Sequence, residues 1–178
     1  MSIDSKPNKY QRWLDAALNQ LNQDFLNGKF QPDNESDIKC HLYHSFLITK
    51  DHIEGLEQAH VLTEFKVLKT QQRIDLAIVK QTRLGYEPRL LLEIKETRKS
   101  DRSPDDIERR VSGDIDKLRM YKKNLDKSKV VYSKSLRRLV VYFFFRGAVG
   151  TSIGMETNRK MESLQKTYTD VDLQWGPR

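Results

Sequence analysis

Two acidic side chains and a lysine lie in strand-like segments in the middle of the chain, in the order Asp75, Glu93 and Lys95. Hard divalent cations prefer carboxylate oxygens as ligands, and Mg²⁺ also keeps several of its waters. A lysine beside two such carboxylates can balance their charge and orient a water molecule, a role helped by the readiness with which its pKa falls on burial. These residue types therefore suit metal-assisted hydrolysis of a phosphate ester.

The segments that carry these residues alternate as strands do. In 73–79, alternation predicts that Asp75 points away from Ile74, Leu76 and Ile78, and in 89–96 it groups Glu93 and Lys95 opposite Leu90, Leu92 and Ile94. If the two strands are neighbours, their spacing of about 5 Å lets one ion bridge both carboxylates. A charge inside a strongly apolar strand costs free energy unless it is paired or metal-bound, which favours function over a solvated surface pattern.

Helical and strand periods predict the elements around these segments. Apolar steps of three or four predict a helix over 10–26 and a second helix after Pro32, with Asp33 or Asn34 as its N-cap. Strands follow over 61–68, 73–79 and 89–96, with Val61, Thr63 and Phe65 on one face of the first and a loop through Gly85 and Pro88 before the third.

The second half of the chain predicts a crossover. Ser103-Pro104-Asp105 has the composition of a helix start, and the apolar run Leu139–Phe145 suits a strand buried on both faces, parallel to its neighbour. A further helix over 155–168 and a short strand over 171–175 end the chain.

The order helix, three strands, helix, strand resembles the core of restriction-endonuclease-like proteins, the PD-(D/E)XK superfamily. The resemblance covers 33–145 and is carried by Arg73-Ile74-Asp75 followed by Glu93-Ile94-Lys95, with Ile74 in place of the proline of the family's name. It implies an α/β fold with a mixed central sheet flanked by helices (α-β-β-β-α-β), preceded here by an extra N-terminal helix within 1–30. It also implies that Asp75, Glu93 and the backbone carbonyl of Ile94 bind Mg²⁺, or Mn²⁺ in its place, and that Lys95 is catalytic.

Glu35 is a fourth candidate, because the family often places a glutamate in the first turn of the second helix to hold a water or a second metal. A carboxylate that stabilises the positive end of the helix dipole explains Glu35 equally well. Glu64, on the first strand, is an alternative for the same role, although an edge position explains it more simply. Whether Glu35 or Glu64 completes the site stays open.

Other motifs give weaker signals. His41 and His44 have helical spacing for joint metal binding but no third ligand with zinc-like spacing, and the glycines at 147, 150 and 154 lack the Gly-Lys-Ser/Thr ending of a P-loop. Lys117 and Tyr121 resemble the region where related nucleases place an extra polar residue. Basic side chains that could contact a nucleic-acid backbone are Arg98, Lys99, Arg102, Arg109, Arg110, Lys117 and Lys122, and a solvated helix face is the simpler explanation for each.

The composition limits the possible settings. A chain of 178 residues fits one domain, and a formal net charge of +7 favours polyanionic partners. The polar N-terminus, the single Cys40 and the lack of a long apolar run predict a cytoplasmic protein without a membrane span. The expected function is DNA cleavage, with DNA over RNA resting on the family alone and a homodimer possible through the N-terminal helix. A catalytically silent module that binds nucleic acid or a protein is the main alternative.

Overall fold

The computed structural model describes residues 8–66, 73–96, 103–128, 136–143 and 152–176. The elements in these residues follow one another in the order α1 (Lys9–Leu26), α2 (Glu35–Thr49), a short 3-10 helix (Lys50–His52), β1 (Ala59–Lys66), β2 (Arg73–Thr82), β3 (Gly85–Glu96), α3 (Pro104–Ser128), β4 (Arg137–Phe143), α4 (Ser152–Thr167) and β5 (Asp172–Gly176).

The strands form one five-stranded sheet in the order β1-β2-β3-β4-β5. The β1–β2 and β2–β3 pairs are antiparallel, whereas β3–β4 and β4–β5 are parallel. The α/β class, the mixed sheet and the parallel strand after the crossover helix are therefore confirmed. Phe144 and Phe145, at the end of the strand predicted there, lie outside the described residues.

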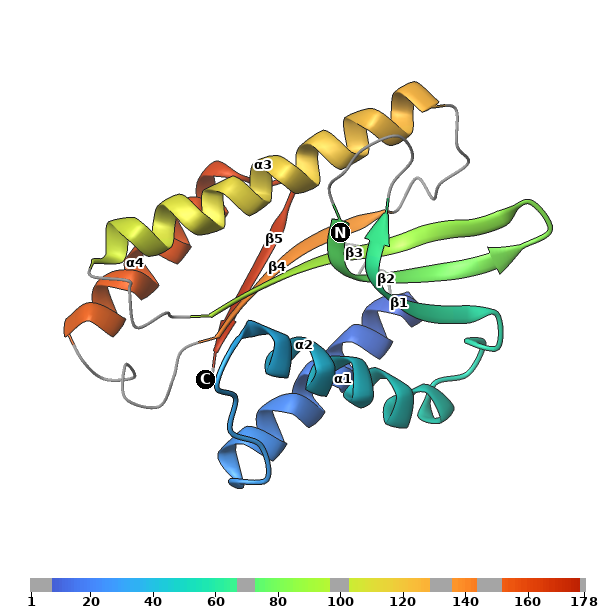
Figure 1. The fold of residues 1–178 in the computed structure, drawn as a ribbon, viewed down its shortest axis with the longest axis horizontal. Coiled ribbons are helices and arrows are strands. Elements are labelled where there is room, and N and C mark those ends of the chain that lie inside the picture. The colour runs from blue at the N-terminus through green and yellow to red at the C-terminus, as the bar shows by residue number, and fades with distance from the viewer. Residues whose placement is uncertain (1–7, 67–72, 97–102, 129–135, 144–151, 177–178) are drawn as a thin grey trace, which may run out of the picture.

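Helices cover both faces of the sheet (Figure 1). One apolar cluster joins α1 and α2 to the sheet and includes Trp13, Phe46, Leu76, Leu92 and Ile94. The other joins α3 and α4 to the opposite face and includes Ile74, Leu91, Ile115, Val140 and Met161. Burial of these two apolar clusters holds the sheet between two helical layers. The layer on one face contains α2, and the layer on the other face contains α3.

The second helix begins as its sequence predicts. Asn34 is the N-cap, its side chain accepts a hydrogen bond from the backbone of Asp37, and the Asp37 side chain reaches back to the backbone of Asn34. This capping box fixes the first turn of α2. Because Ile38, Leu42 and Phe46 are fully buried, the turn that carries Glu35 is held against the sheet.

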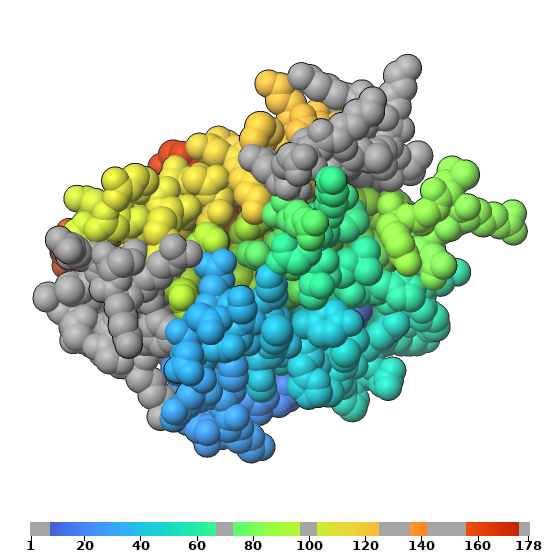
Figure 2. Space-filling model, in the orientation of Figure 1, coloured from blue at the N-terminus to red at the C-terminus, as the bar shows by residue number. Residues whose placement is uncertain are grey.

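The predicted loop through Gly85 and Pro88 is wrong, because both residues belong to β3. The β2–β3 hairpin turns at Arg83 and Leu84, and its end projects from the body of the molecule (Figures 1 and 2). A proline removes one ladder hydrogen bond and is tolerated in a sheet mainly at edges and bulges. Here the register shifts between Ile78 and Val79, and Val79 is the partner of Pro88, so the irregularity accommodates the proline.

The regular alternation predicted for β1 and β2 is also wrong at one point. Ile74 packs with the α3–α4 cluster, whereas Leu76 packs with the α1–α2 cluster. On β1, Phe65 lies against the α3–α4 cluster and Val61 belongs to the other. The two strands pair Thr63 with Leu76 and Phe65 with Ile74, so the break in both strands falls at Glu64 and Asp75. Glu64 has a φ of 50°, in the left-handed region that non-glycine residues rarely adopt.

Candidate active site

Asp75, near the start of β2, lies beside Glu93 and Lys95, near the end of the antiparallel strand β3. The three residues lie between α2 and α3. Leu76 pairs with Leu92, so Asp75 and Glu93 occupy the next opposite positions of this antiparallel pair. The Oδ2 atom of Asp75 accepts a hydrogen bond of 2.9 Å from the backbone amide of Ile94. This bond fixes the Asp75 carboxylate beside the segment that carries both Glu93 and Lys95.

Lys95 connects the two helical layers across the end of the sheet. Its Nζ atom lies 3.2 Å from Oε1 of Glu35 on α2 and 3.5 Å from Oδ2 of Asp114 on α3. The surfaces of α2, in light blue, and α3, in yellow, meet over this end of the sheet in Figure 2. Glu35 therefore contacts the lysine in addition to lying in the first turn of α2.

Glu93 is the most deeply buried member, with only 1% of its side chain exposed. Burial, the nearby charge of Asp75 and that of Asp114 raise the pKa of Glu93 to about 9, although Lys117 opposes the shift. The Nζ atom of Lys117 lies 2.7 Å from Oε1 of Glu93, a charge pair that lacks the direction of a good hydrogen bond. The ammonium of Lys117 is therefore the cation in contact with this carboxyl group.

The expectation that burial lowers the pKa of Lys95 is wrong. Burial does act in that direction, but the carboxylates of Asp114, Glu35 and Asp75 outweigh it, and the pKa of Lys95 is raised above its usual value of 10.5. Lys95 is therefore a protonated ammonium at neutral pH. It can donate hydrogen bonds to a water or a phosphate oxygen, but it is not a base in this arrangement.

Glu64 is directed elsewhere. It pairs with Lys39 of α2, and 43% of its side chain is exposed. Lys39 also lies 4.0 Å from Oδ1 of Asp75, so it links the two positions at which the β1–β2 alternation breaks. Of the two candidate glutamates for the fourth position, Glu35 is the one that accepts hydrogen bonds from Lys95 among the described residues.

The carboxylates suit a hard divalent ion in chemistry but do not yet surround one position. Among the described residues, no three His, Cys, Asp or Glu side chains are grouped closely enough to hold a metal. Oε1 of Glu93 and Oδ2 of Asp114 are nevertheless buried acceptors without a well-directed hydrogen bond. Such oxygens retain capacity for a cation, and burial, with the nearby charge of Asp75 as a smaller cause, raises the pKa of both Glu93 and Asp114.

Two further residues of the cluster, Asp114 and Lys117, come from α3. The sequence does not point to Asp114; for Lys117 it offers both the place of an extra polar residue and, more simply, a solvated helix face, and the contact with Glu93 contradicts the second. They lie one turn apart on α3, flanking the buried stripe of Val111, Ile115 and Leu118. A carboxylate and an amine at this spacing beside an apolar stripe were the available signal.

The remaining candidates lie elsewhere or outside the described residues. His41 stacks on Phe30, its Nε2 atom lies 2.9 Å from Oδ2 of Asp24, and His44 is exposed, so no joint metal site forms there. Arg109 pairs with Asp106, and Arg110 donates to the backbone carbonyl of Glu96. Outside the described residues lie Arg98, Lys99, Arg102, Gly147 and Gly150.

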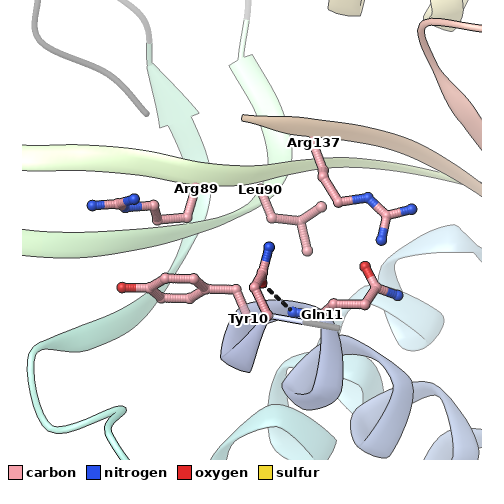
Figure 3. Close-up of a pocket in the computed structure, with 6 residues that line it drawn as sticks. Tyr10, Gln11, Arg89, Leu90 and Arg137 are labelled. Atoms are coloured by element: carbon pink, nitrogen blue, oxygen red, sulfur yellow. Dashed lines mark hydrogen bonds between the residues drawn. The ribbon is translucent and has the colours of Figure 1, made fainter. Parts of the chain in front are cut away.

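A separate small pocket lies near the start of β4, on the α1 side of the sheet. Tyr10, Gln11, Arg89, Leu90 and Arg137 line it together with the N-cap Asn8 (Figure 3). Arg89 lies 2.7 Å from a carboxylate oxygen of Glu87, and Arg137 forms a charge pair with Asp172. Because both arginines have acidic partners and no predicted site residue lines the pocket, the candidate site remains the cluster at the end of β3.

The pKa of Glu93 predicts how stability depends on pH. Its folded-state pKa of about 9 lies above the usual glutamate value of 4.5, so folding takes up a proton between these pH values. The carboxyl therefore destabilises the fold increasingly as pH rises through this range. We expect Glu93→Gln, which cannot ionise, to raise the free energy of unfolding by about 1–3 kcal/mol near pH 8. The gain is limited because Lys117 loses its partner.

Urea denaturation near pH 8 and near pH 4.5 measures this effect. The difference between Glu93→Gln and the wild type should shrink toward zero at the lower pH, where both folded and unfolded carboxyls bind protons. An equal difference at the two pH values would show that Glu93 ionises in the folded protein much as it does in the unfolded chain.

A scan of protein-family models, a search of the curated proteins and a search of the solved structures found no match to this chain. No helix in the described ranges has the length and apolar character needed to cross a bilayer. The residues of the cluster therefore carry the functional argument by themselves.

Proposed function

We propose that this protein is a metal-dependent nuclease of the PD-(D/E)XK type that hydrolyses phosphodiester bonds of DNA. The observation that carries the proposal is the meeting of Asp75, Glu93 and Lys95 at one end of two adjacent strands, with the amide of Ile94 bonded to Asp75. In the proposed site, Asp75, Glu93 and the backbone carbonyl of Ile94 hold Mg²⁺, for which Mn²⁺ can substitute.

Each residue has a part in the proposed reaction. A bound divalent ion would supply positive charge against the phosphate. Lys95, as an ammonium, donates hydrogen bonds to the attacking water or to a nonbridging phosphate oxygen, while Glu35 and Asp114 hold the lysine in place from both sides. The water oxygen forms a bond to phosphorus and gives up a proton to solvent, while the bond to the leaving oxygen breaks and the leaving oxygen takes up a proton from solvent.

Two features of the fold support the assignment. The order α2, β1, β2, β3, α3, β4 agrees with the α-β-β-β-α-β core that the sequence resemblance implies. The break in alternation falls at Glu64 and Asp75, and the Asp75 side chain there accepts the hydrogen bond from the amide of Ile94. A left-handed φ at a non-glycine residue costs of the order of 1 kcal/mol or more, and such strain is concentrated at functional sites.

The proposed substrate follows from charge and resemblance. The net charge of +7 favours a polyanion, and the choice of DNA over RNA comes from the family alone. The ammonium groups of Lys39, Lys95 and Lys117 surround the carboxylates, so a phosphate approaching the cluster meets positive charge as well as negative.

A catalytically silent module that binds nucleic acid is the second candidate. Two observations favour it: Oε1 of Glu93 is already in contact with the ammonium of Lys117, and the described residues include no group of three close ligands. In this alternative the charges would form a closed internal network, and the basic surface alone would bind the nucleic acid.

Incubation of the purified chain with supercoiled plasmid distinguishes the two candidates. The nuclease proposal predicts nicked or linear DNA with Mg²⁺ or Mn²⁺ and intact plasmid with a chelator. Fluorescence anisotropy with labelled duplex, measured in the chelator, reports binding separately from cleavage. Binding without cleavage in either metal supports the silent module, whereas neither binding nor cleavage rejects both candidates.

A further inference from the structure

We infer that Lys117 is an internal cation that lies against the Glu93 carboxyl in the metal-free protein and leaves it when a divalent ion binds there. The inference rests on the proposed function, because it names a residue that competes with the metal of that site. The observation behind it is the contact of 2.7 Å between Nζ of Lys117 and Oε1 of Glu93, the oxygen that a metal would need.

The two partners differ in their freedom to move. Glu93 is 1% exposed, and it stands on β3 between two other strands of the sheet, so its backbone has little freedom. The side chain of Lys117 is 24% exposed and has a flexible four-carbon stem on α3. The contact between Nζ of Lys117 and Oε1 of Glu93 does not have the geometry of a directed hydrogen bond. A competing cation would therefore displace the lysine and leave the carboxylate where it is.

Lys95 does not fit this role. Carboxylates of α2 and α3 hold it on both sides, at 3.2 Å from Glu35 and 3.5 Å from Asp114. Lys117 has one ion pair among the described residues, and its partner there is Glu93. A metal that takes Glu93 thus removes the partner of Lys117 but leaves the partners of Lys95.

Asp114 offers the displaced ammonium a new partner. It lies one turn before Lys117 on the same helix, and the two charges already interact, since Lys117 lowers the pKa of Asp114 against the raising effect of burial. The Oδ2 atom of Asp114 is buried without a well-directed hydrogen bond. Movement of Lys117 from Glu93 toward Asp114 would keep the ammonium paired while it frees the Glu93 oxygen.

Calorimetric titration of Mn²⁺ into the full chain tests the competition. Lys117→Met removes the charge but keeps the stem, and we expect it to bind Mn²⁺ about tenfold more tightly than the wild type, because no ammonium must be displaced. Lys123→Met is the matched control, since Lys123 is exposed on the same helix and the change in net charge is identical. Its affinity should equal that of the wild type.

Each pattern of affinities has a distinct meaning. Equal Mn²⁺ affinity of Lys117→Met and the wild type overturns the inference and leaves the proposed metal site intact. An equal gain in both methionine variants also overturns it, because a general charge effect would then explain the result. If the wild type and Lys117→Met both bind no Mn²⁺, the proposed metal site fails together with the inference.

A measurement on the wild type covers the case in which Lys117→Met does not fold. Amine-reactive labelling, read by mass spectrometry at each lysine, reports how available the ammonium nitrogen is. We expect Mn²⁺ to raise the labelling rate of Lys117 several-fold and to leave that of Lys123 unchanged. An unchanged or lower rate at Lys117, at Mn²⁺ concentrations that saturate the site, overturns the inference.

Discussion

Replacing Asp75 by asparagine is expected to lower metal-dependent cleavage at least about 100-fold while the fold is retained. Asparagine keeps a carbonyl oxygen that can accept the hydrogen bond from the amide of Ile94, which Asp75 accepts at 2.9 Å. What it loses is the negative charge that a divalent ion needs. Alanine is the blunter choice, since it would also leave the Ile94 amide without that acceptor, at a cost of about 1–3 kcal/mol.

The measurement combines plasmid cleavage in Mg²⁺ with calorimetric binding of Mn²⁺. We expect Asp75→Asn to lose both, with a far-ultraviolet circular dichroism spectrum like that of the wild type. Asp116→Asn is the control, because Asp116 is an exposed carboxylate on α3 and its substitution makes the same change in charge. Full cleavage by Asp75→Asn would remove Asp75 from the site, and with it the proposed enzyme.

The sequence predicted β3 well because its signal is local. Alternation from Leu90 to Lys95 follows from strand geometry alone, and the structure confirms that Leu90, Leu92 and Ile94 lie on one face while Leu91 faces the other apolar cluster. The N-cap Asn34 and the first helical residue Pro104 were equally local. Because β3 carries Glu93 and Lys95, the shared face of these two site residues could be predicted from the alternation of their neighbours in the chain.

The same rule failed where a partner strand changed the outcome. Alternation predicted that Ile74 and Leu76 lie on one face of the sheet. In the structure Ile74 pairs with Phe65, and both side chains face the α3–α4 layer. The left-handed φ of Glu64 on β1 lies at this change of face. Likewise, Pro88 predicts a loop by itself, and only the register shift opposite it, at Ile78 and Val79, allows it inside a strand.

The contribution of α3 depended on how the helix docks. Ile115 and Leu118 form a buried stripe on α3, but a buried stripe does not tell which flanking side chains reach a neighbouring strand. The contacts of Asp114 with Lys95 and of Lys117 with Glu93 arise from the depth and rotation at which α3 packs on the sheet. These are tertiary properties, and they convert a three-residue motif into a network of charges.

Lys95→Met is expected to lower the cleavage rate at least about 100-fold with little change in DNA affinity, since positioned proton donors contribute effects of this size. Methionine keeps most of the length of the side chain but cannot donate a hydrogen bond to water or phosphate. The raised pKa of Lys95 means that the wild-type group is charged throughout the neutral range, so the loss should not depend on pH between about 6 and 8.

Single-turnover cleavage separates the chemical step from binding, and anisotropy with labelled duplex in a chelator gives the affinity. Lys166→Met, an exposed position on α4, controls for the change in net charge. A large loss of affinity in Lys95→Met alone would make Lys95 a phosphate contact rather than a catalytic residue. The distinction is physical: Glu35 and Asp114 hold the ammonium at the end of the sheet, so its three donors serve one fixed position and not an extended DNA surface.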